Sequence, residues 1–262
     1  RNSVNQQYAI NTSGGSVNHH YYLSVGLDRN LQDLVGNHSQ RLTINAGNTY
    51  SWFNNRLTLH TGFAFSESKY ALNNDGKLPV NYPYLTLGDN APAYFEIRQS
   101  FKEQAKNAGL LDWSYRPMEE IFQADHTREI ADSRMNVNLD FKIFKEFSVR
   151  ILYQYNKGRL EEENFHSEKT YFTRDLINRF TQVDSAGNFS YPIPKDKGIS
   201  DQRNETYTAH NFRLQLNYAH EWEGKHKLMH AISTLAGAEV RNICLIKEER
   251  RLYGYKKGML TG

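Results

Sequence analysis

The sequence is poor in cysteine and lacks long apolar runs, and each shortage excludes a class of protein. Its 262 residues include one cysteine, Cys244, which excludes an intrachain disulfide framework and a multi-cysteine metal site. No run of about 18 apolar residues is present, so the sequence offers no candidate for a membrane-spanning helix. The hydrophobic fraction is 39%, below the roughly 45–50% that is usual for soluble domains.

The sequence also lacks an excess of charge of one sign. It has 32 basic and 29 acidic residues, a formal net charge of +3, and the two signs are interspersed along the chain. A nucleic-acid-binding domain normally shows a basic tract or stripe. We therefore expect no nucleic-acid partner.

Motifs of catalysis and of metal binding are missing as well. The chain contains no GxSxG, HExxH, Walker-type glycine loop or CxxC, and its ten histidines have no metal-site spacing. Asp132 and Asp140 fall on one face of a predicted strand, but about 27 Å apart, too far for paired acid–base work. The run Glu161–Glu163 is interpreted as a solvated loop face. We expect no catalytic residue, no metal ion and no cofactor, and hence no enzyme.

What the sequence has in quantity is two-residue alternation of apolar and polar side chains. Leu23, Val25 and Leu27, for example, are separated by small or polar residues. Alternation over about ten residues is typical of a strand with one apolar and one polar face. Eight strands are predicted, at 6–13, 17–28, 40–52, 56–69, 130–143, 147–160, 206–222 and 226–249.

Short and long connections alternate between these strands. The connections after the odd-numbered strands are short, and 13–16 and 53–55 supply glycine and asparagine for tight turns. The connections after the even-numbered strands are long, at 29–39, 70–129, 161–205 and from 250 onward. This pattern is typical of an outer-membrane barrel. It predicts an all-β, antiparallel transmembrane β-barrel segment of about eight strands, with long, partly helical extracellular loops.

Aromatic residues, 13% of the chain, gather near the predicted short turns. Trp52, Phe144, Phe147 and Trp222 predict a girdle at the membrane interface, where amphipathic rings lie at the level of the headgroups. The faces opposite the apolar ones carry Thr, Asn, Arg and Asp residues. These faces are too polar for a buried core, and we expect them to face a lumen or a plug.

The two longest loops are predicted to carry structure and function, because structureless loops of this length are uncommon. Helical patterns run over 100–111 and over 168–181, and Phe172, Leu176, Ile177 and Phe180 share one face of the second. That face is expected to dock onto the base of its own loop or onto the barrel mouth. Candidate ligand-binding aromatic residues in the first loop are Tyr82, Tyr84, Tyr94, Trp113 and Tyr115.

Three segments, taken in order, resemble a known family. They are Ser13-Gly14-Gly15-Ser16 followed by Tyr21-Tyr22-Leu23-Ser24-Val25-Gly26, the stretch 171–182 followed by Tyr191-Pro192-Ile193-Pro194, and the stretch 226–240. Together they resemble the TonB-dependent outer-membrane transporters of the SusC/RagA-like family, found in Bacteroidetes. The sequence departs from the first motif at Leu27, where the family commonly has an aromatic residue.

The resemblance implies a 22-stranded barrel in the outer membrane, closed by an N-terminal plug domain. It also implies a SusD-like surface lipoprotein over the mouth, contact with outer-membrane lipid, and import of glycan or peptide fragments driven through the TonB complex. Residues 1–262 would then form a partial TonB-dependent receptor β-barrel domain, with the plug domain and the final strands absent.

Two alternatives remain open on the sequence. A secreted β-sandwich that binds or degrades polysaccharide would need a dry core between two sheets and a catalytic carboxylate pair. A passive outer-membrane barrel, such as an assembly factor or an adhesin, would have no plug domain before the first strand.

Overall fold

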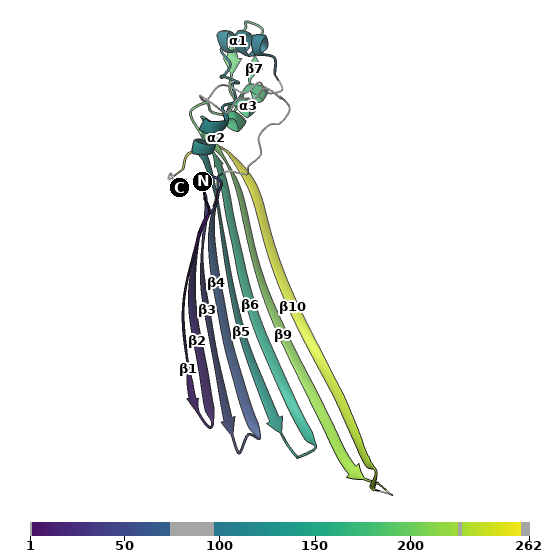
Figure 1. Cartoon of the computed structure of the whole chain (residues 1–262). Coiled ribbons are helices and arrows are strands. Elements are labelled where there is room, and N and C mark those ends of the chain that lie inside the picture. Colours follow the sequence, from purple (N-terminus) through teal and green to yellow (C-terminus); the bar gives the residue numbers. More distant parts are fainter. Residues whose placement is uncertain (1, 74–96, 225–226, 258–262) are drawn as a thin grey trace.

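The computed structural model describes residues 2–73, 97–224 and 227–257, and its main element is one antiparallel sheet (Figure 1). The eight strands lie in the order β1-β2-β3-β4-β5-β6-β9-β10. The all-β prediction is confirmed. The strands are β1 (Val4–Ser16), β2 (His19–Leu31), β3 (Asn37–Trp52), β4 (Leu57–Leu72), β5 (Ala124–Lys142), β6 (Phe147–His166), β9 (Gly198–Glu223) and β10 (Met229–Tyr255).

All eight predicted strands are present, and several extend further toward the long loops than the sequence indicates. β6 continues to His166 and β9 begins at Gly198. The interpretation of Glu161–Glu163 as a loop face is therefore wrong, because these residues are paired within β6. Charged side chains on both faces hide the alternation in this part of the strands.

The first hairpin turn differs from the prediction, whereas the second agrees with it. Ser16 pairs with His19, so the turn lies at 17–18, and the glycines at 14 and 15 belong to β1. A Cβ on Gly15 would lie 2.1 Å from the backbone oxygen of His19, which explains the glycine there by close strand approach. In the second turn Phe53, Asn54 and Asn55 all have positive φ, at 53°, 54° and 62°.

The sheet has one apolar and one polar face. Across β4, β5, β6 and β9, the register partners Leu57, Phe141, Val149 and Leu216 share one face, and the adjacent row of Thr58, Asp140, Arg150 and Gln215 shares the other. We call the apolar face between the short turns and Leu27, Phe65, Met135 and Tyr155 the apolar band. No second large sheet packs on it in the part of the chain that the structure describes.

The helices and a small hairpin lie together at the end of the sheet where the long connections are (Figure 1). These elements are α1 (Gln99–Ala108), α2 (Pro117–Gln123), α3 (Tyr171–Phe180), β7 (Gln182–Val183) and β8 (Phe189–Ser190). Both predicted helices are confirmed with shorter bounds. Thr170 caps α3 by accepting a hydrogen bond from the Thr173 backbone N–H, and left-handed Gly109 ends α1. No helix among the described residues is long and apolar enough to cross a membrane.

The hairpins are staggered relative to one another. One row of partners runs from Ser16 and His19 to Tyr50 and on to Leu214. β3 extends only to Trp52 beyond this row, whereas β9 extends to Glu223. Figure 1 shows the turn ends stepping progressively from β1 to β10. β1 and β10 are the two edges of the sheet, and each has one side without a partner strand among the residues that the structure describes.

Candidate functional site

Charged side chains gather on the polar face of the sheet near its loop end. The register places Arg128, Glu162 and Arg203 on adjacent strands, and two residues further along it places Asn164, Asp201 and Arg251 together. All of these residues except Arg128 border a hollow of about 430 Å³ beyond the apolar band. The loop-end cluster consists of His126, Glu162, Asp201, Arg203, Glu249 and Arg251.

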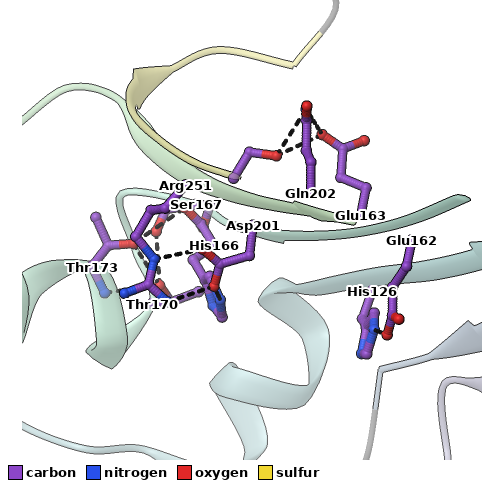
Figure 2. Close-up of polar contacts among 11 residues, drawn as sticks. His126, Glu162, Glu163, His166, Ser167, Thr170, Thr173, Asp201, Gln202 and Arg251 are labelled. Atoms are coloured by element: carbon purple, nitrogen blue, oxygen red, sulfur yellow. Dashed lines mark hydrogen bonds and ion pairs between the residues drawn. The ribbon is translucent and has the colours of Figure 1, made fainter. Parts of the chain in front are cut away.

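Glu162 is the acidic centre of the first part of this cluster. It accepts hydrogen bonds from His126 Nε2 at 2.7 Å and from Arg128 Nη2 at 2.8 Å, and Figure 2 shows the contact with His126. Burial opposes the charge of this carboxylate, but the two hydrogen bonds outweigh burial and leave the pKa of Glu162 below its usual value. Glu162 is therefore ionised at neutral pH.

Asp201 and Arg251 form the second part. Arg251 donates from Nε and, at 2.7 Å, from Nη2 to the two carboxylate oxygens of Asp201, a bidentate pair (Figure 2). These hydrogen bonds lower the pKa of Asp201 against the opposing effect of burial. His166 Nε2 lies 3.7 Å from the same carboxylate, and burial nevertheless lowers the pKa of His166.

Arg203, Glu205, Lys247 and Glu249 complete the charged surface on β9 and β10. Arg203 donates to Glu205 at 2.6 and 2.9 Å and lies 3.5 Å from Glu249. Lys247 lies 2.9 Å from Glu249 and 3.7 Å from Glu205. Acidic and basic groups thus alternate across the strands, which suits a ligand that carries both signs of charge or many hydroxyl groups.

Helix α3 connects this cluster to the loops. The ring centroids of Phe172 and His166 lie 4.2 Å apart. The guanidinium carbon of Arg251 lies 5.2 Å from the Phe172 ring centroid. Thr173 donates to the backbone oxygen of His166 at 3.1 Å, and Ile177 is buried. The predicted docking of the α3 face is confirmed for Phe172 and Ile177. It is wrong for Phe180, which is 55% exposed, because it is in the last turn of α3.

Helix α3 also holds the first long loop through that loop's backbone. Asn178 donates to the Leu111 carbonyl at 2.9 Å and accepts from the Leu111 N–H at 2.8 Å. Arg174 donates to the carbonyls of Asp112 and Ser114 at 2.6 and 3.0 Å. The two long loops therefore form one packed unit beside the loop-end cluster.

Two of the five predicted ligand-binding aromatic residues are within this unit. Trp113 is 8% exposed and donates from Nε1 to Asp175 at 3.1 Å, and Tyr115 packs edge-on against Tyr171 at 5.5 Å between ring centroids. Both contacts are internal to the loops. The other three, Tyr82, Tyr84 and Tyr94, lie outside the described residues. Ligand binding by the five stays a prediction.

The four predicted girdle residues lie at the turn end of the sheet. Trp52 is the last residue of β3 and Trp222 the last but one of β9, while Phe147 begins β6 and Phe144 is in the turn before it. The membrane-interface role stays a prediction, and the structure adds histidines to the same region. Stacked rings join Tyr50 to His19 and Trp52, and join Trp222 to His220 and His230.

The sequence reasoning missed the loop-end cluster, although a signal for it exists. Asp201, Arg203 and Glu205 recur at every second position in β9, and Lys247, Glu249 and Arg251 do so in β10. The two runs oppose each other with complementary charge at all three pairs, Lys247 with Glu205, Glu249 with Arg203 and Arg251 with Asp201. Within the described ranges, no group of three or more His, Cys, Asp or Glu side chains is placed to hold a metal ion.

The eight-stranded sheet and its loops are similar to solved transporter structures. The chain matches the RagAB peptide importer in its "closed-closed" state with a TM-score of 0.63 and 14% identity, over 97% of this chain. It matches the "open-open" state with a TM-score of 0.64 and 15% identity, also over 97%. The chain has a transporter-like fold. It spans about a quarter (26%) of the length of the importer chains it matches.

Comparisons of sequence add no relative. No protein-family model matches this chain, and no curated protein matches it. At 14–15% identity the importer structures establish the arrangement of the strands and loops and nothing finer.

Proposed function

We propose that this chain is part of the barrel wall of an outer-membrane transporter that imports oligomeric nutrients, either glycan or peptide fragments. The observation that carries the proposal is the division of one continuous sheet into an apolar and a charged face, with long loops at one end only. An outer-membrane barrel needs this division, because lipid contacts one face and water the other. The likeness to importer chains supports transport rather than catalysis or passive anchoring.

In this proposal the polar face lines a water-filled lumen and the loop-end cluster meets the cargo. The paired charges of Arg203, Glu249, Asp201 and Arg251 can exchange partners with amino, carboxylate or hydroxyl groups of a passing oligomer. Loop aromatic residues would stack on sugar rings or pack on peptide side chains. Because Trp113 is buried, its part in binding would be to fix the shape of the loop.

The proposal includes the rest of a closed 22-stranded barrel and its partners. The free edges of β1 and β10 would pair with further strands, since a closed barrel has no edge. A plug domain inside the barrel, the TonB complex and a SusD-like surface lipoprotein belong to the same proposal. Support for a partner comes from the neighbouring structures, which are those of a RagAB importer.

Cell fractionation and an electrophoretic test of the intact protein would test this function. A membrane barrel is expected in the outer-membrane fraction, and its band should shift between unboiled and boiled samples, because the closed barrel resists detergent until heated. An unshifted protein in the soluble fraction would contradict the proposal.

Ligand binding is tested with alanine variants of the loop aromatic residues. Tyr82→Ala, Tyr84→Ala, Tyr94→Ala and Tyr115→Ala should weaken binding of an oligosaccharide or oligopeptide panel without lowering the amount of heat-shifted barrel. Loss of about 1–3 kcal/mol per stacking ring corresponds to roughly a fivefold to hundredfold change in Kd. Unchanged affinity in all four would remove these residues from the site.

A further inference from the structure

The apolar face of the sheet changes character beyond the apolar band, where four cations lie on three strands. Arg29 follows Leu27 on β2, Lys157 follows Tyr155 on β6, and each lies two residues beyond the band on the same face. Ten residues separate each of them from the first residue of its strand, His19 or Phe147. Lys69 on β4 and Arg159 on β6 lie two residues further on. These four residues form the cationic row.

The cationic row stands at the height expected for lipid headgroups. Ten strand residues span roughly 33 Å, which a tilt of about 40° reduces to roughly 25 Å, the usual height of the apolar band of a membrane barrel. Lys69 and Arg159 are held by Glu129 at 3.3 and 3.2 Å. Arg29 and Lys157 are exposed, and their side chains have no partner among the described residues. Two cations are therefore available to an external anion.

Next to the cationic row and extending further from the turns, the same face is hollowed. A hollow of about 760 Å³ is lined by five strands, and four of them supply carboxylate and amide side chains, among them Gln40, Glu129, Glu161, Glu163, Gln202 and Asn204. Gln40 and Asn204 are exposed and have no side-chain partner within the described ranges. The amide groups can donate to and accept from hydroxyl groups, and the carboxylates can accept from them. The chemistry of the hollow therefore fits a sugar.

We propose that this polar hollow and the cationic row form a binding site for a phosphorylated glycolipid of the surrounding membrane. The unpaired cations follow the apolar band along the strands, and the hollow begins level with Arg29, at its register partner Gln40, and extends further from the turns. Acyl chains, phosphates and sugar rings follow one another in the same order in such a lipid. A lipid with phosphate but no sugar would use only the first two of these three surfaces. The inference rests on the proposed membrane location and adds a specific lipid to it.

The test is titration of the intact protein, purified in detergent, with lipopolysaccharide and with phosphatidylglycerol, read by native mass spectrometry. Lipopolysaccharide should bind about tenfold more tightly than phosphatidylglycerol. Arg29→Gln with Lys157→Gln should weaken binding of both lipids by about thirtyfold, since each of the two cations near a membrane surface contributes about 1 kcal/mol. Gln40→Ala with Asn204→Ala should weaken lipopolysaccharide alone. Lys145→Gln, an exposed cation at the turn end, is the matched control and should change neither affinity.

Two results would overturn the inference. One is equal affinity of the unaltered protein for the two lipids, and the other is unchanged lipopolysaccharide binding in the Arg29→Gln, Lys157→Gln protein. The heat-shift gel on the same samples separates this failure from that of the proposed function. A heat-shifted barrel with no preference for lipopolysaccharide would contradict the proposed glycolipid site only. An unshifted protein would contradict the proposed barrel itself.

Discussion

At the scale of single residues, one glycine determines how two strands share a tyrosine. Gly158 of β6 is buried beneath the ring of Tyr207, which belongs to β9. The tyrosine crosses β6 and donates from its hydroxyl to Asp132 of β5 at 2.8 Å. A Cβ at position 158 would lie 2.0 Å from Cε1 of that ring. The absent side chain therefore lets a single tyrosine link three strands.

Gly158→Ala is expected to lower the free energy of unfolding by about 1–3 kcal/mol, because the ring must leave its place and lose Asp132. The midpoint of urea unfolding of the intact protein measures the effect. Gly47→Ala is the control, since a Cβ there has no neighbour closer than the Thr61 backbone oxygen at 3.9 Å. Equal midpoints for the two variants would show that the ring is not held over Gly158.

Asp201 should make the loop end sensitive to acid. Its pKa is lowered in the folded protein, chiefly by the hydrogen bonds from Arg251. Such a group stabilises the fold fully above the unfolded pKa of about 4 and loses that contribution as pH falls through the folded pKa. Asp201→Asn should therefore be less stable than the unaltered protein at pH 7, and the difference should shrink toward pH 3. Unfolding midpoints at several pH values measure this difference, and a constant gap would contradict it.

At the scale of elements, helix α3 organises both long loops. Its first turn contacts the loop-end cluster through Phe172, and its later residues Arg174 and Asn178 hold the backbone at 111–114. Side chain to backbone bonds of this kind depend little on the identity of the residues they hold. The first loop can therefore change its exposed side chains without losing its attachment.

Asn178→Ala should release the first loop locally. Both polar backbone groups of Leu111 lose a partner, at a cost of about 1–3 kcal/mol to the local structure. Hydrogen exchange of residues 97–123 should accelerate. Exchange in β5 and β6 between their short turn and the pair Met135 and Tyr155 should not change. Lys169→Ala, an exposed residue just before α3, is the control. Unaltered exchange in residues 97–123 would show that other contacts hold the loop.

At this scale the sequence predicts the strands that have one apolar and one polar face. Alternation marks β2, β4, β5 and β6 most clearly between the turns and the end of the apolar band, and the sequence predicts all eight strands of the sheet. Alternation is absent at 200–205, where both faces are polar, and so it does not predict the loop-end cluster. Gly14 and Gly15 were assigned to a turn, because strand contact and tight turns both require glycine. The two hydrogen bonds between Asn178 and the Leu111 backbone join residues far apart in sequence, so no local sequence pattern can predict them.

At the scale of the whole molecule, the two sheet edges dominate the behaviour of this chain. β10 has 27 residues and β1 has 13, and each is paired on one side only. Unpaired backbone groups along so long an edge are templates for association with other chains. In the proposed barrel, further strands would pair with both edges and prevent this association.

Residues 1–262 refolded alone in detergent should form oligomers or aggregates and show no heat-shifted band. The intact protein, refolded in the same way, should elute as a discrete species and should shift. Size-exclusion chromatography followed by the gel measures both. A monodisperse, heat-shifted product from the eight strands alone would mean that β1 and β10 can close on each other.

The stagger of the hairpins has a mechanical meaning. In a barrel of tilted strands, turn ends that step along the sheet come to one level, and each row of hydrogen-bonded partners becomes a ramp that winds around the wall. The contacts from Thr49 to His60 and from Asp140 to Arg150 follow such ramps. A force applied to one hairpin along the barrel axis then acts obliquely to these rows of hydrogen-bonded partners. Several neighbouring strands then share the force, and the hydrogen bonds between any two strands do not have to break one after another.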